Sequence, residues 1–150
     1  MTTEKKTFTI KCFVDYFISA CVIQERKERF FSLNKNEKKF QKIIDQLDHL
    51  EVNLCIEEAI NIANLRCYSE IINRFDLNGN ENVFAISTIR AMKSGVHCAL
   101  VDALSSLFKI GNGSIIGWPS SSPKFFFYFG EDVSAQYYWK LDNLSQSGRA

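Results

Sequence analysis

The sequence predicts an α+β domain. Its N-terminal two thirds, with four to five helices, are expected to pack on a small antiparallel C-terminal β-hairpin or three-stranded meander. Three observations lead to this prediction. Apolar residues recur at intervals of three and four through about residue 110, which is the period of a helix face. Gly111 ends that pattern, and the aromatic run Lys124 to Phe129 beyond it, bounded by turn-forming residues, is typical of a strand.

Size and composition predict one domain spanning residues 1–150. The chain is 46% hydrophobic and 23% charged, enough for a single core with a polar exterior. We expect residues 1–6 and 145–150 to be frayed. No apolar run approaches the roughly 18 to 20 residues that cross a bilayer, so no membrane association is predicted.

The first predicted helix lies between Phe8 and Phe31, although alternation at its start leaves a short strand open as an alternative. Asn34 and Glu37 have the spacing of a capping box, which would begin a second helix. The apolar face of that helix consists of Phe40, Ile43, Ile44, Leu47 and Leu50.

A third helix is predicted over 56–75, ending at Asn78-Gly79. Residues 83–92 fit either a helix or a strand, and we favour a helix because both neighbouring segments are predicted to be helical. Residues 96–108 follow helical spacing closely and predict a helix that ends at Gly111.

Beyond Gly111, residues 115–118 and 124–129 predict a hairpin, with a second turn at 130–132. Residues 135–141 form either a third strand or a short final helix. Nine of the twenty aromatic residues lie between Trp118 and Trp139. Because a strand alternates its faces, one set of these rings must meet something other than the main core, either a second layer of the same protein or a partner. The predicted partner-binding residues are Trp118, Phe126, Tyr128, Glu131, Asp132 and Tyr138.

Charge and cysteine usage limit the function classes. Residues 1–42 carry ten Lys and Arg against five Asp and Glu, whereas residues 43–150 carry eight against twelve. Only Lys124 and Lys140 lie close to the aromatic strands, so a nucleic-acid partner is not expected. Five widely spaced cysteines predict free thiols and a reducing, cytoplasmic location. With two histidines and no C-x2-C motif, no metal and no cofactor are predicted.

Arg90 and His97 form an R-x6-H pattern, which resembles the outer limit of the R-x4-6-H motif of the HEPN ribonucleases. The resemblance implies metal-independent RNA cleavage, with both residues in acid–base catalysis and phosphate binding. Ala91 stands where that family commonly has a polar residue, and the β-rich C-terminus differs from its all-helical fold.

The sequence therefore predicts a small cytosolic interaction protein whose partner is another protein. One specific form is an immunity protein that neutralises a bacterial toxin, a class of small domains with few motifs. The content of 15 Ile and 11 Asn is typical of AT-rich bacterial genes. The alternative is the ribonuclease that would use Arg90 and His97.

Overall fold

A six-stranded antiparallel sheet, in the order β1-β6-β5-β4-β2-β3, lies at the centre of the computed structural model, which describes residues 9–36, 39–120 and 123–141. Its strands are β1 (Ile60–Asn61), β2 (Asn82–Ser87), β3 (Val96–Ala99), β4 (Ser114–Gly117), β5 (Phe125–Phe129) and β6 (Gln136–Lys140). The predicted C-terminal meander is present as β4, β5 and β6. The prediction of a small sheet of two or three strands is nevertheless wrong, because β1, β2 and β3 come from segments that were predicted to be helical and extend the sheet on both sides.

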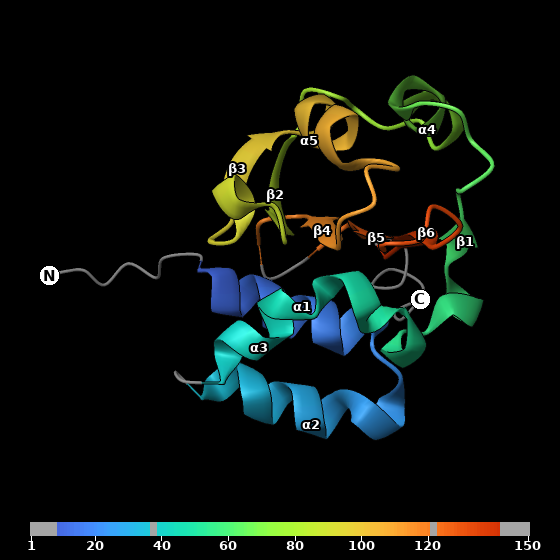
Figure 1. The fold of residues 1–150 in the computed structure, drawn as a ribbon. Coiled ribbons are helices and arrows are strands. Elements are labelled where there is room, and N and C mark those ends of the chain that lie inside the picture. The colour runs from blue at the N-terminus through green and yellow to red at the C-terminus, as the bar shows by residue number, and fades with distance from the viewer. Residues whose placement is uncertain (1–8, 37–38, 121–122, 142–150) are drawn as a thin grey trace, which may run out of the picture.

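Helices cover both faces of this sheet (Figure 1). One face carries α1 (Ile10–Cys21), α2 (Gln24–Lys35), α3 (Phe40–Asp45) and the 3-10 helix η1 (Leu47–Asn53). The short helix η2 (Ile56–Glu58) leads from η1 into β1. The opposite face carries α4 (Tyr68–Arg74) and α5 (Leu100–Leu107), and the 3-10 turn η3 (Arg90–Met92) connects β2 to β3. The α+β class is confirmed, as a three-layer arrangement.

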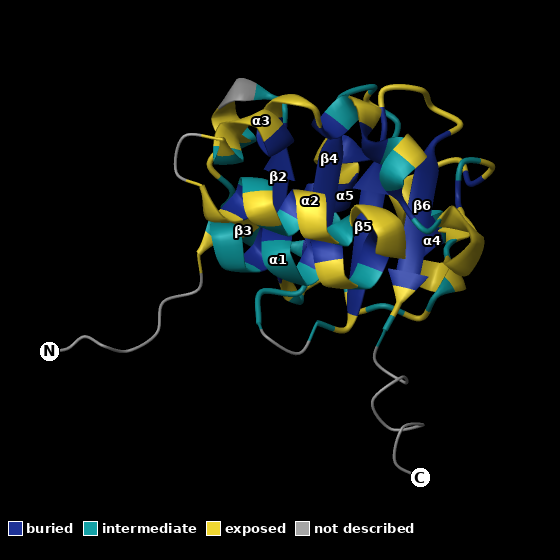
Figure 2. Ribbon diagram, turned by 90° about the horizontal axis from the view of Figure 1, so that it is seen from below, coloured by how far each residue is buried: buried dark blue, intermediate teal, exposed yellow. Residues whose placement is uncertain are grey.

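The two helical layers create two cores, which divide the aromatic residues of β5 between them. Phe126 packs toward α1, with its ring centroid 5.6 Å from that of Phe13, and Tyr128 belongs to the same core. Phe127 and Phe129 belong to the core on the α5 side. Figure 2 shows the central strands in dark blue behind the helices, as expected when both faces are buried. The alternative of a sheet packed on both faces is therefore confirmed.

Burial on both faces explains why β2 was mispredicted as a helix. All residues from Val83 to Ser87 are buried, so the apolar and polar alternation that identifies a half-exposed strand is absent. β2 pairs with β3 on one side and β4 on the other. Helix α5 was predicted correctly from residue 100 onward, whereas residues 96–99 form the edge strand β3. Residues 136–140 form a strand, which resolves the last open alternative.

The remaining helices differ from the predictions at their ends. The first helix ends at Cys21, where an isolated antiparallel bridge pairs Val22 with Leu54, and the charged segment after it forms α2. In the predicted third helix, only α4 at 68–74 is α-helical.

No helix in the described ranges is long and apolar enough to cross a bilayer. The ends predicted to be frayed, 1–6 and 145–150, lie outside the described residues.

The predicted capping role of Asn34 is wrong, because Asn34 lies inside α2 and is only 1% exposed. Its Nδ2 donates to the backbone oxygen of Lys11 at 2.9 Å and to Oδ1 of Asp15 at 2.7 Å. A buried polar side chain thus joins α2 to α1, which suits a helix that buries few other residues. Glu37, the other half of the predicted capping box, lies outside the described residues.

Candidate functional site

The structure separates the predicted partner-binding residues into a buried group and an exposed group. Phe126, Tyr128 and Tyr138 are core residues, at most 3% exposed, so a binding surface on the folded protein cannot include them. Trp118 is half-buried, with its ring 5.8 Å from that of Phe125. Glu131 and Asp132 are exposed in the turn between β5 and β6.

The buried tyrosine of β5 positions η1 beside this turn. The Tyr128 hydroxyl donates to the backbone oxygen of Leu47 at 2.6 Å and accepts from the backbone N–H of Leu50 at 3.2 Å. It therefore bridges η1 at its kink, where His49 leaves helical geometry. Burial raises the pKa of the Tyr128 hydroxyl, so the group stays protonated and keeps its donor role.

Two residues of β6 fix the same segment at further points. The Tyr137 hydroxyl donates to Oε2 of Glu51 at 2.6 Å, and burial followed by this carboxylate raises the pKa of Tyr137 to about 12. Nε1 of Trp139 donates to the backbone oxygen of Cys55 at 3.2 Å. Polar atoms of β5 and β6 thus hold residues 47–55 against the sheet.

These contacts bring together two acidic segments that are far apart in the sequence. Residues 47–61 and 130–134 contain six carboxylates and no Lys or Arg. We call this surface the acidic face, and its carboxylates are Asp48, Glu51, Glu57, Glu58, Glu131 and Asp132. The backbone N–H of Glu131 donates to the backbone oxygen of Asp48 at 3.3 Å, which joins the two segments directly. On the α2 side the face is bordered by Arg26, whose Nη1 donates to Oδ1 of Asn53 at 3.0 Å, and by the pocket that Glu58 lines together with Lys27 and Lys140.

Exposed aliphatic side chains accompany these charges. Six large hydrophobic residues are exposed in the described part of the chain, and four of them lie in the same two segments. The four are Val52, which is 81% exposed, and Ile56, Ile60 and Val133. Aliphatic side chains among charges of one sign are typical of a surface that contacts another macromolecule.

At the junction of the two segments, His49 lies between two carboxylates. Its Nε2 is 3.6 Å from Oδ2 of Asp48, and its Nδ1 is 3.4 Å from Oε1 of Glu131. Ligand atoms of these three residues lie within 4.8 Å of one another, a donor set that could hold a divalent cation. His49 and Glu131 are largely exposed, so the same geometry also fits a simple surface ion pair.

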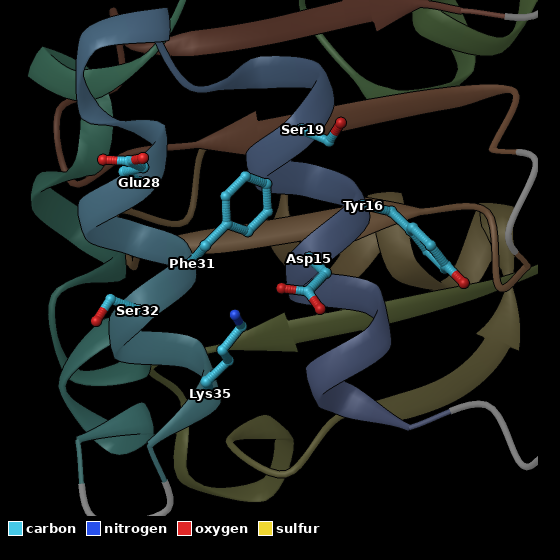
Figure 3. A pocket seen from close by; sticks show the side chains of 7 residues that line it. All are labelled: Asp15, Tyr16, Ser19, Glu28, Phe31, Ser32 and Lys35. Carbon is cyan, nitrogen blue, oxygen red and sulfur yellow. The ribbon is translucent and has the colours of Figure 1, made fainter.

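A separate open pocket of about 700 Å³ lies between α1 and α2 (Figure 3). Its lining residues are Asp15, Tyr16, Ser19, Glu28, Phe31, Ser32 and Lys35. In Figure 3 the Phe31 ring projects between the two helices, and Asp15 and Lys35 extend toward each other from opposite walls. The Asn34 amide donates to the Asp15 carboxylate and so orients it. The pocket carries charges of both signs, and no local sequence pattern predicts it because its walls come from two helices.

The two residues of the ribonuclease-like pattern do not lie on a common helix. Arg90 begins the 3-10 turn η3, whereas His97 lies on the edge strand β3, exposed and with its ring 4.9 Å from that of Phe84. The helical face on which the HEPN resemblance depends is therefore not formed. Comparison with protein-family models, curated proteins and solved structures gives no significant match to the chain.

Proposed function

We propose that the protein is a small interaction protein that binds a positively charged protein through the acidic face. One specific form of this proposal is an immunity protein that neutralises a basic bacterial toxin. The observation that carries it is the meeting of residues 47–61 and 130–134, which together contain six carboxylates and four exposed aliphatic residues.

The chemistry of this surface supports a partner rich in Lys and Arg. The formal net charge of the whole chain is only +1, so the negative charge is a local property. A local field of this kind steers a basic partner and can raise association rates by roughly 10- to 1,000-fold. Val52 and Val133 would supply the apolar centre of the contact, since buried apolar area contributes more binding free energy than exposed ion pairs do.

The free cysteines support a reducing compartment for this binding. All five lie within the described residues, and none is in a disulfide. We therefore propose that binding occurs in the cytoplasm.

The test compares two double charge reversals that change the net charge equally. Glu57→Lys/Glu131→Lys alters the acidic face, and Glu28→Lys/Asp102→Lys alters exposed carboxylates on α2 and α5. Asp132 is left intact because its Oδ1 accepts from the N–H and hydroxyl of Ser134, which holds the turn. Circular dichroism should give the same folded spectrum for both variants.

Each variant and the unaltered protein are used as bait in the native host, and the captured protein is then purified for binding kinetics. We expect a partner of high isoelectric point that the acidic-face variant loses and the control variant retains. Its association rate should fall roughly 10- to 100-fold with the acidic-face reversal and should fall with added salt. A partner that binds both variants equally, or independently of salt, would refute the proposal, as would the lack of any stoichiometric partner.

A further inference from the structure

We propose that Cys21 and Cys55 are an oxidation site, forming a reversible disulfide that ties the end of α1 to the segment between η1 and η2. This inference does not depend on the proposed function. It rests on the antiparallel bridge between Val22 and Leu54, which makes the flanking residues Cys21 and Cys55 direct register partners.

Backbone hydrogen bonds on both sides of the bridge define this register. The N–H of Cys55 donates to the oxygen of Cys21 at 2.7 Å, and the N–H of Ile23 donates to the oxygen of Asn53 at 2.9 Å. Cys21 is the last residue of α1, and the hydrogen bond from the Cys55 N–H to its oxygen brings the two backbones into direct contact. Disulfides join residues whose Cα atoms are about 4.4–6.8 Å apart, so the proposed bond requires a contact of this kind.

The two thiols differ in access, as expected for an attacked and a resolving cysteine. Cys55 is half-buried and lines an open pocket of about 730 Å³ together with Lys27 and Glu58. Cys21 is fully buried. Burial, followed by the neighbouring Cys55, raises the pKa of the Cys21 thiol, and burial followed by Glu58 raises that of Cys55. Exchange should therefore be slow at neutral pH and faster at alkaline pH, where the thiolates form.

Oxidation by a low-molecular-weight disulfide such as oxidised glutathione balances in two steps. The Cys55 thiolate attacks one sulfur of the oxidant, forming a mixed disulfide and releasing one glutathione thiolate. The Cys21 thiolate then attacks the Cys55 sulfur and releases the second glutathione thiolate. The two protons lost by the protein thiols are taken up by the two glutathione thiolates, so two thiols are oxidised and one glutathione disulfide is reduced.

Cys67 is the main competitor for the oxidant. It is exposed, and its hydrogen bond with Ser69, at 3.1 Å, lowers the pKa of its thiol. Cys12 complicates the mapping, because trypsin leaves Cys12 and Cys21 in one peptide, residues 12–26, whereas Cys55 is the only cysteine in residues 43–66. The variant Cys12→Ser/Cys67→Ser/Cys98→Ser removes both difficulties and retains only the proposed pair.

The experiment treats this triple variant and the unaltered protein with oxidised glutathione at alkaline pH under native conditions. Free thiols are then blocked, and the mass of the intact protein and of the tryptic peptides is measured. We expect the triple variant to lose two hydrogen atoms, to give a linked 12–26 and 43–66 peptide pair, and to unfold at a higher temperature. Dithiothreitol should reverse all three changes. Adding Cys55→Ser should leave one unreacted thiol at Cys21.

Three outcomes would overturn the proposal: a stable glutathione adduct that stops at Cys55, two thiols that remain unreacted, or a disulfide between Cys21 and Cys55 that forms only in denaturant. Mapping the unaltered protein provides a readout that does not depend on any variant folding. There the 43–66 peptide should be linked to 12–26, with Cys67 carrying glutathione, and a link from 43–66 to Cys67 or Cys98 would contradict the inferred register.

Discussion

Removing the hydroxyl of Tyr128 should lower the free energy of unfolding by about 2 kcal/mol. Tyr128→Phe keeps the buried ring but leaves the Leu47 oxygen and the Leu50 N–H without their shared partner. A buried hydrogen bond contributes about 1 kcal/mol net, and an unsatisfied buried group costs about 1–3 kcal/mol. Partial closure of η1 would recover some of this free energy, so we expect a loss of about 2 kcal/mol.

Urea and thermal unfolding measure this loss. For a domain of this size, about 2 kcal/mol lowers the melting temperature by about 4–8 °C. Tyr68→Phe is the matched control, because Tyr68 is exposed and its change should stay within about 0.5 kcal/mol. If Tyr128→Phe were no more destabilising than Tyr68→Phe, the bridging hydroxyl would not be what holds η1 to the sheet.

Three further predictions concern other contacts. Gly113→Ala should destabilise the protein by about 3 kcal/mol or more in a urea titration, because a Cβ would lie 1.9 Å from the backbone nitrogen of Asp48. The control Gly79→Ala should cost much less, because a Cβ at Gly79 would contact only side chains. Asn34→Ala should cost about 1–2 kcal/mol through the two lost bonds between α1 and α2, and a neutral result would contradict their role. The pKa of Tyr137 is raised from 10 to about 12, so its neutral form stabilises the fold; this contribution is complete below pH 10 and is lost as the pH rises to about 12. Denaturant titrations across that range should give a smaller decline for Tyr137→Phe, and an unchanged decline would refute the assignment.

The sequence correctly predicted the elements that have one polar and one apolar side, and those that are flanked by turn-forming residues. Helix α5 has polar residues such as Asp102 and Ser105 opposite a buried face, and the aromatic strand β5 is preceded by Pro123 and followed by Gly130. β2 had neither signal, since it is buried on both sides in the middle of the sheet. The helix predicted over 56–75 was wrong for a different reason. Strand β1, within this range, has only two residues, and it is defined by its pairing with β6 and not by a local sequence pattern.

The candidate site was predicted only where it lies within one short segment. Glu131 and Asp132 were correctly assigned to a turn. Asp48 and His49 lie more than 80 positions earlier in the sequence, so they meet that turn only after the chain folds. The charge of single segments indicated part of the site, since residues 47–61 contain four carboxylates and no Lys or Arg. The burial of Phe126 and Tyr128 depended on the second helical layer, which local patterns do not specify.

The pairing of β1 with β6 also determines when the sheet can form during synthesis of the chain. Ile60 leaves the ribosome 78 positions before its sheet partner Tyr138. Contacts between distant positions are slow to form, because the loop between them must close first. The nascent chain therefore displays residues 47–61 without the strand that orders them, and the two halves of the acidic face can meet only after residues 130–140 have been synthesised.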